Sequence, residues 1–146
     1  MIAIEKSIFI NRPLQEVFEF MSNPANDAQW QSSTKSAEWT SEDPPGVGST
    51  INQVGRFMGR DTSGTGEVTS WDPPNGFGVK SLTGPFPFES MTKFESKENG
   101  TQLTISAQAE VGGFFKIAEG LVTRQAEKQF DTDLGSLKVL LEEGHS

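Results

Sequence analysis

Turn-forming residues divide most of the chain into segments of strand length, and the hydrophobic pattern within these segments fits strands. Residues 42–48, 72–76, 84–87 and 98–100 are rich in the residue types that break regular structure. From residue 101 onward, apolar side chains alternate with polar ones, as expected for a strand with one packed face. We predict seven strands, at residues 2–10, 33–41, 49–58, 61–71, 77–83, 86–96 and 101–111. This pattern favours an antiparallel sheet with one packed face and one solvated face.

The last two predicted strands form a hairpin. The pair Asn99-Gly100 favours a type I′ turn, which needs positive φ at both central residues. In the strand before this turn, the packed face carries large aromatic residues at its ends and two small hydroxyl side chains, Ser90 and Thr92, in its middle. A face built in this way leaves space rather than filling it.

The helical period appears in three places. Pro13 suits the first position of a helix, and apolar residues follow it at helical spacing. Asn23 before Pro24 is a typical N-cap, which predicts a second short helix that ends near Trp30. From Phe114 to about Glu142, apolar residues recur near every 3.6 positions and predict one long helix.

Composition limits the class of protein. The 146 residues fit a single domain, residues 1–146, and the absence of cysteine excludes disulfides and cysteine-ligated metals. The formal net charge of −8, with dispersed cations, disfavours nucleic acid and anionic membrane surfaces as partners. The opening residues lack a signal-peptide pattern and no window approaches a membrane span. We therefore expect a cytoplasmic protein without membrane insertion.

In this order of elements the sequence resembles the START-like superfamily (helix-grip fold, also called SRPBCC), and within it the polyketide cyclase/dehydrase-type branch. The resemblance covers essentially the whole chain. It rests on the segments "IFINRPLQEVFEFMSNPANDAQW", "GVGSTINQVGRFMG", "GEVTSWDPPNGFGVKS", "GPFPFESMTKFESKENGTQLT" and "GGFFKIAEGLVTRQAEKQFDTDLGSLKVLLE". The resemblance implies an α+β fold in which a seven-stranded curved antiparallel sheet wraps around a long C-terminal helix, with two short helices after the first strand.

The same resemblance implies an elongated internal cavity that admits small, mostly apolar molecules. Relatives of this kind include lipid carriers, aromatase/cyclases and hormone receptors. Membership therefore implies no single activity, and function has to be argued from the site.

Residues suited to catalysis are scarce. The chain has no tyrosine, and its only histidine, His145, is next to the last residue. No Ser-His-Asp or Cys-His site can be built and no cluster has metal-ligand spacing, so we expect no metal site and no cofactor. The remaining catalytic candidates are Arg56, Asp61 and Glu67, because a carboxylate in an apolar cavity can act as acid or base near neutral pH. The alternative is that both acids face water, which the opposite phase of Glu67 and Val68 favours.

Aromatic residues give a stronger signal, since the chain has 11 phenylalanines and 3 tryptophans. A largely apolar pocket with a few convergent polar groups is typical of small-molecule sites. The candidate ligand-binding residues lie on inward phases or near helix ends: Trp30, Gln53, Phe77, Ser81, Phe86, Phe88, Ser90, Thr92 and Phe115. For the aromatic members near helix ends and loops, a place in the packed core explains the residue about as well.

Three functional hypotheses follow. The first is a binding module that holds a small hydrophobic or aromatic molecule, for example a lipid, in the internal cavity without chemistry. The second is an enzyme of cyclase or dehydratase type, in which confinement does much of the work and Arg56, Asp61 or Glu67 assists proton transfer. The third is a protein-interaction role, which no particular residue in the sequence supports.

Overall fold

The computed structural model describes residues 2–42, 44–57, 59–84, 87–110 and 119–143. Within them the chain forms one antiparallel sheet of seven strands in the order β1-β7-β6-β5-β4-β3-β2. The strands are β1 (Ile2–Ile10), β2 (Thr34–Trp39), β3 (Thr50–Phe57), β4 (Arg60–Asp72), β5 (Gly76–Thr83), β6 (Phe88–Lys97) and β7 (Gly100–Ala109). Each coincides with a predicted strand to within about three residues at either end, so the predicted sheet is confirmed.

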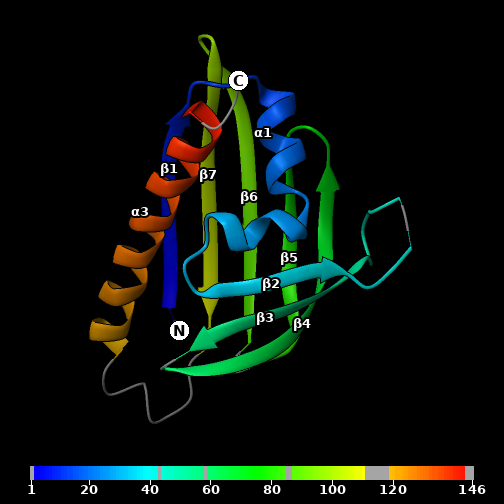
Figure 1. The fold of residues 1–146 in the computed structure, drawn as a ribbon, viewed down its shortest axis with the longest axis vertical. Coiled ribbons are helices and arrows are strands. Elements are labelled where there is room, and N and C mark those ends of the chain that lie inside the picture. The colour runs from blue at the N-terminus through cyan, green and yellow to red at the C-terminus, as the bar shows by residue number, and fades with distance from the viewer. Residues whose placement is uncertain (1, 43, 58, 85–86, 111–118, 144–146) are drawn as a thin grey trace.

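The helices also follow the prediction. An α-helix, α1 (Leu14–Met21), and a 3₁₀-helix, η1 (Pro24–Gln29), connect β1 to β2, and the long helix α3 (Glu119–Glu143) ends the described chain. Figure 1 shows α3 running along β1, α1 over the opposite part of the sheet, and η1 lying across the concave face above β2. The predicted beginning of the long helix, at Phe114, lies outside the described residues.

The sheet curls because the pairing of β4 with β5 is irregular. Its pairing with β5 shifts register twice, between Thr65 and Gly66 and again between Val68 and Ser70. Each such bulge inserts an unpaired residue, which bends the strand and increases its twist. As a result β2, β3 and the first half of β4 fold forward over the concave face, as Figure 1 shows.

Two local predictions about turns and helix ends are wrong by one residue. Lys97 pairs with Gly100, so the central residues of the β6–β7 turn are Glu98 and Asn99, and the positive φ, 55°, belongs to Glu98. Glycine at position 100 serves a close approach instead, because a Cβ there would lie 2.5 Å from the Ile10 carbonyl oxygen. Pro13 precedes the first helical residue of α1 and has an extended ψ of 146°.

The short helices are held where the sequence predicts. Val17, Phe18 and Met21 of α1 are buried, which confirms the apolar stripe. The Asn23 side chain accepts a hydrogen bond from the Ala25 N–H at 3.1 Å, which confirms Asn23 as the N-cap of η1.

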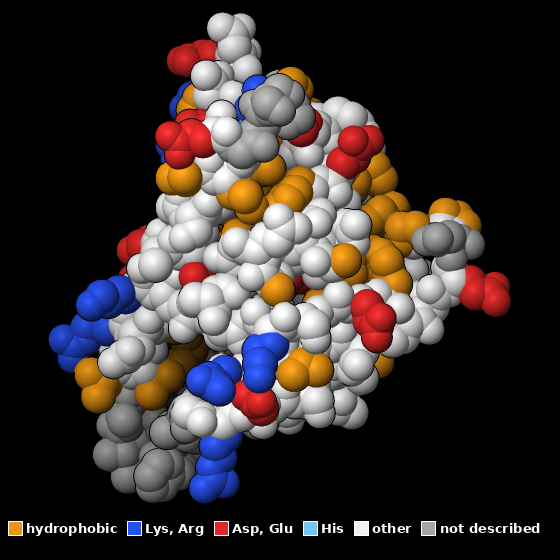
Figure 2. Space-filling model, viewed as in Figure 1, with side chains coloured by type: hydrophobic (Ala, Val, Ile, Leu, Met, Phe, Trp, Pro, Cys, Tyr) orange, Lys and Arg blue, Asp and Glu red, His pale blue; other side chains and the backbone are white. Residues whose placement is uncertain are grey.

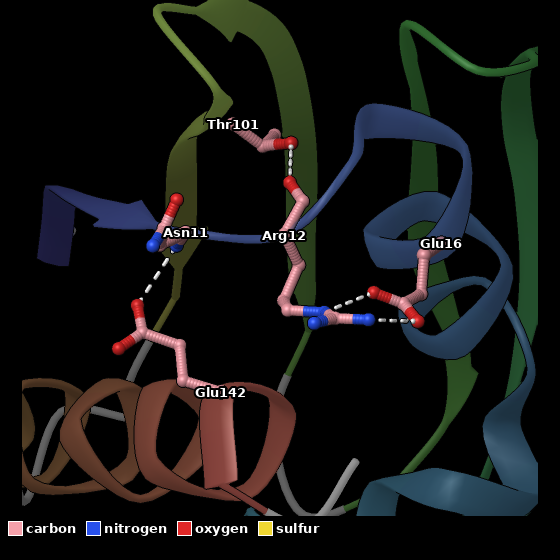
Figure 3. Close-up of polar contacts among 5 residues, drawn as sticks. All are labelled: Asn11, Arg12, Glu16, Thr101 and Glu142. Atoms are coloured by element: carbon pink, nitrogen blue, oxygen red, sulfur yellow. Dashed lines mark hydrogen bonds and ion pairs between the residues drawn. The ribbon is translucent and has the colours of Figure 1, made fainter. Parts of the chain in front are cut away.

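Polar contacts tie the β1–α1 connection to the end of α3 (Figure 3). The Arg12 guanidinium donates to both carboxylate oxygens of Glu16, at 2.5 and 3.0 Å, and the Thr101 hydroxyl donates to the Arg12 carbonyl. From α3, the Glu142 carboxylate accepts the Asn11 N–H at 2.8 Å. This bond, together with the neighbouring Lys138, lowers the pKa of Glu142. The connection is thus fixed from both sides, which positions α1 and η1 over the sheet.

Candidate functional site

The concave face of the sheet has two ends that differ in burial. On β6, Thr92 and Phe94 are 5% and 2% exposed, whereas Ser90 and Phe88 on the same face are half-buried. On β7 the same change occurs, from buried Leu103 and Ile105 to half-buried residues nearer its end. We call the two regions the packed end (Ile10, Val17, Phe18, Met21, Phe94, Leu103, Leu137 and Leu141) and the open end (Val79, Ser81, Phe88, Ser90, Ala107, Ala109, Val122 and Ala126).

The open end is open for two reasons. Its strand residues are small, since Ser90 lies between Val79 and Ala107 in the register of β5, β6 and β7. In addition, the backbone of α3 lies closest to β1, so it covers the edge of the sheet more than its middle. Figure 2 shows a hollow between the first turns of α3 and the β3–β4 side of the molecule, with hydrophobic side chains at its wall.

The predicted ligand residues fall into two groups. Phe77 meets Phe18 and Phe94 edge to face or tilted, with ring centroids 6.2 and 6.1 Å apart, and Trp30 and Thr92 are buried beside the same cluster. The other described candidates belong to the open end or its rim: Gln53, Ser81, Phe88 and Ser90. Phe86 and Phe115 lie outside the described residues.

Two of the predicted polar contacts already have protein partners. The Gln53 amide donates to the Thr34 hydroxyl at 2.8 Å, and that hydroxyl donates to Gln31. The Ser81 hydroxyl accepts the Phe88 N–H at 2.9 Å. These bonds hold β2, β3, β5 and β6 at the rim of the open end and leave a free lone pair or proton on each group.

The predicted catalytic residues lie on the outward phase of β3 and β4. Arg56 pairs with Asp61 across the strands, and the Asp61 carboxylate also receives Lys35 Nζ at 3.0 Å. Lys35 first, and then Arg56, lowers the pKa of Asp61, whose side chain is 52% exposed. Glu67 pairs with Lys80 at 3.5 Å on the same outward side. The structure therefore brings Arg56 and Asp61 together and leaves Glu67 apart from them.

A different acid, which was not predicted from the sequence, lies on the concave side. Asp27 is half-buried in η1, at a spacing of three from the buried Pro24 and the buried Trp30, whereas Ala25 and Ala28 are exposed. Burial raises the pKa of the Asp27 carboxyl to about 7. The spacing of three, Pro24-Asp27-Trp30, is the sequence signal that could have found it.

Two depressions also occur on the outside of the described structure. One, of about 480 Å³, lies on the convex face of β1, β7 and β6 and is lined by polar side chains that include Glu5, Glu89 and Gln108. The other, of about 520 Å³, lies between η1 and α3 beside Gln29 and Gly135. Both are open to solvent and shallow, so neither resembles an enclosed ligand site.

Two kinds of feature are absent from the described part of the chain. Among residues 2–42, 44–57, 59–84, 87–110 and 119–143, no three His, Cys, Asp or Glu side chains come together as metal ligands would. None of the helices described here combines the length and the apolar character that a membrane crossing requires.

Comparison with known proteins gives the family. Residues 1–142 match the family model described as polyketide cyclase / dehydrase and lipid transport. The chain belongs to this family. No curated protein matches the chain in sequence. The resemblance seen in the sequence is thereby confirmed over almost the full length.

Solved structures of other proteins show the same fold. TTHA0849 from Thermus thermophilus is similar with a TM-score of 0.83 at 18% identity, over 99% of each chain. A START superfamily protein from Mycobacterium smegmatis has a TM-score of 0.77 at 13% identity, over 93% of this chain and 94% of its own. The Zhui aromatase/cyclase from Streptomyces sp. R1128 has a TM-score of 0.73 at 15% identity, over 99% and 98%. At these identities the likeness concerns the fold of this polyketide cyclase/dehydrase family member, and not its substrate.

Proposed function

We propose that this member of the polyketide cyclase/dehydrase and lipid transport family binds a small, mostly hydrophobic molecule at the open end of its concave face. The observation that carries the proposal is the contrast along single strands. On β6 and β7 the same face changes from fully buried large residues to half-buried Ser90, Ala107 and Ala109. An apolar surface in contact with water on a concave face gains free energy when a hydrophobic molecule covers it, at roughly 25 cal/mol per Å².

The composition of the open end supports a ligand that is mostly apolar. Its walls carry Val79, Ala107 and Ala109 from the sheet and Val122 and Ala126 from α3. Few polar groups border them, namely the side chains of Gln53, Ser81 and Ser90. A small number of polar groups in an apolar site orients a ligand without dominating its affinity.

A cyclase or dehydratase function is the second candidate, and the family description includes it. In the form predicted from the sequence, it would use Arg56, Asp61 or Glu67 for proton transfer. These side chains are ion-paired and lie on the outward phase of their strands. That geometry favours binding without chemistry over this form of catalysis, because a general acid or base has to reach the reacting atom.

Native mass spectrometry on gently purified protein, followed by titration with a neutral naphthalene fluorophore, tests the proposed function. We expect a co-purified molecule or, after its removal, saturable binding with a blue-shifted emission. A protein that carries no molecule and leaves the fluorophore unchanged at millimolar protein would contradict the proposal. For the second candidate, replacement of both Asp61 and Glu67 by the corresponding amides should abolish any turnover, and full retention of turnover would remove that version.

A further inference from the structure

A group of half-buried and exposed apolar side chains lies on the side of the molecule where β2 ends. Figure 2 shows hydrophobic side chains there, on the right of the view, between the β4–β5 turn and the protruding β2–β3 loop (residues 40–49) of Figure 1. The rings of Trp39 on β2 and Trp71 on β4 meet edge to face, with centroids 6.2 Å apart. We call this group the tryptophan patch; it comprises Trp39, Pro44, Pro45, Val47, Trp71, Pro73 and Pro74.

The β2–β3 loop holds Val47 outward. The Gly48 N–H donates to the Val68 carbonyl at 2.9 Å, which fastens the loop to β4 shortly before the tryptophan of that strand. Within the loop, the Ser49 N–H donates to the Gly46 carbonyl at 3.0 Å, and the Ser49 hydroxyl accepts the Gly46 N–H at 2.8 Å. Gly48 has a φ of 92°, which favours glycine. Val47 is therefore fixed at 70% exposure, the highest value among the large hydrophobic side chains that the structure describes.

A patch of this kind is typical of an interaction surface. Single exposed apolar side chains are ordinary, whereas a contiguous group of them marks a site where another molecule binds. Tryptophan is enriched among the residues that contribute most to binding between proteins. Two strands and a hydrogen-bonded loop already hold the tryptophan patch in place, so little conformational freedom is lost when a partner covers it.

The charge around the tryptophan patch has one sign. Residues 36–55 and 61–79, which supply all of the patch, contain no lysine or arginine. They carry three exposed acids, Glu38, Glu42 and Asp72, which we call the border acids. None of the border acids forms an ion pair with a cation in the described part of the chain. Figure 2 shows acidic side chains, and no basic one, on this side of the view. The border acids are thus free to pair with a positively charged partner.

The sign of this charge distinguishes three possible occupants of the patch. In a symmetric dimer both subunits use the same surface, so the border acids of the two copies would meet and repel one another. A membrane surface rich in anionic lipids is repelled in the same way. A segment that carries apolar side chains between lysine or arginine residues matches both the patch and its charge.

We propose that the tryptophan patch docks a basic amphipathic segment of a partner protein. The apolar side chains of the segment cover Trp39, Val47 and Trp71, and its lysine or arginine side chains pair with the border acids. The patch shares no residue with the open end. The docking therefore does not rest on the proposed binding function, and either can hold without the other.

Two peptides of opposite charge test the docking. One is the fluorescein-labelled helix-forming peptide LKKLLKLLKKLLKL, and the other has glutamate in place of every lysine. Fluorescence anisotropy at a salt concentration of about 0.15 M measures the affinity of both. We expect saturable binding of the lysine peptide, at least tenfold tighter than that of the glutamate peptide, because the border acids attract the first and repel the second.

Two triple variants of equal net charge separate the patch from the acidity of the whole chain. Replacement of the three border acids by their amides should weaken the lysine peptide about eightfold, because each exposed ion pair contributes about a twofold change. Replacement of Glu89, Glu95 and Glu110 by glutamine removes the same number of charges at exposed positions of β6 and after β7. This control should change the affinity by less than about twofold.

Val47→Ser tests the apolar part of the docking. The side chain lies mostly in water, so the variant should fold as before, which circular dichroism checks. It should weaken the lysine peptide about fivefold, because the complex loses buried apolar area. Leu82→Ser makes a comparable change at a 50% exposed position of β5, outside the patch, and should leave the affinity within about twofold.

Several results would overturn the inference. Failure of the lysine peptide to bind, or equal binding of both peptides, would contradict the docking. Equal weakening by the two triple variants would mean that the acidity of the whole chain attracts the peptide. Self-association of the unmodified protein in sedimentation velocity, if Val47→Ser abolishes it, would assign the patch to a second copy. Binding to phosphatidylcholine vesicles that Val47→Ser abolishes would assign it to a membrane. All of these results leave the proposed function at the open end untouched.

Discussion

At the packed end of the concave face, the rings of Phe18, Trp71, Phe77 and Phe94 meet at centroid distances of 5.5 to 6.3 Å, whereas at the open end the sheet carries mostly serine and alanine. Both ends belong to one continuous sheet. Edge-to-face contacts between rings stabilise the fold in addition to the burial of their apolar area. Small residues bury little apolar area and therefore stabilise the fold less. One end of a sheet can therefore supply the stability of the fold while the other keeps a surface for a ligand.

The two halves of α3 differ in the same way in how deeply their apolar side chains are buried against the sheet. Leu134, Leu137 and Leu141, in the second half of the helix, are buried in the packed end. Earlier in the helix, Val122 and Ala126 are half-buried against Ile2 and Ile4 of β1. The helix is therefore anchored at its C-terminal half, where Glu142 also holds the Asn11 N–H.

Shortening one apolar side chain in each half of α3 should give the largest difference in the free energy of unfolding between a change at the packed end and a change at the open end. Leu137 is fully buried, so Leu137→Ala should lower the free energy of unfolding by about 3–5 kcal/mol through lost burial and the resulting cavity. Val122→Ala, at the open end, should cost below about 1 kcal/mol because the side chain is already half in contact with water. Urea unfolding followed by circular dichroism measures both. Equal costs would mean that the two ends are packed alike.

The strands and helices could be predicted from the sequence because their signals are local. Alternation over 101–111 and the turn residues between segments depend on a few neighbours, and these predictions are confirmed. The β6–β7 turn was misplaced by one residue because its register depends on how Lys97 and Gly100 pair across the strands. Gly100 is required by the approach of the Ile10 carbonyl from a third strand, which no local pattern contains.

The half-buried Asp27 was not predicted from the sequence for a similar reason. In the run "NPANDAQW" every polar residue reads as a solvated loop or cap residue. The 3₁₀ period of η1 aligns Asp27 with Pro24 and Trp30, and the packing of η1 against β2 and α1 leaves the Asp27 side chain half-buried. By contrast, Asp61 and Glu67 were predicted as candidate catalytic acids that lie near arginines in the sequence. The structure pairs them with surface cations.

The pH dependence of stability tests the burial of Asp27 in η1. Its pKa in the folded protein, about 7, is above the ordinary value near 3.9 of an unfolded chain, so the folded state binds more protons between these values. Its contribution to stability is complete below about pH 4 and is lost as the pH rises to about 7. Asp27→Asn removes this loss, and should leave stability unchanged at pH 4 but raise it by roughly 2–4 kcal/mol at pH 8. Denaturant titrations at both pH values give the comparison, with Asp72→Asn as control. A constant difference across this range would place Asp27 in water.

Filling the open end should separate binding from stability. Ala107→Leu adds three carbons to a half-buried position between Ser90 and Ile4, and should weaken the neutral fluorophore at least tenfold while unfolding changes by less than about 1 kcal/mol. Thr92→Leu enlarges a buried side chain on the same face by one heavy atom and replaces its hydroxyl. Because no space exists there, it should cost about 1–3 kcal/mol in stability. Fluorescence titration and urea unfolding on the same samples test both. Unchanged binding in Ala107→Leu would locate the ligand elsewhere.

The smallest effect is expected at Asp61 of β4, which belongs to neither end. Asp61 is ion-paired to Lys35 and Arg56 on the outward phase of the strands, and its exposed position means that salt screens these pairs. Asp61→Asn should therefore change fluorophore affinity by less than about twofold, with or without added salt. Its pKa is lowered in the folded protein, so its slight contribution to stability is present at neutral pH and is lost as the pH falls through the folded pKa. Affinity measured at low and high ionic strength checks this expectation, and Lys35→Gln provides the matched change on the other partner. A large loss of affinity in Asp61→Asn alone would mean that the carboxylate contacts the ligand, and would place the site at the β3–β4 hairpin instead of the open end.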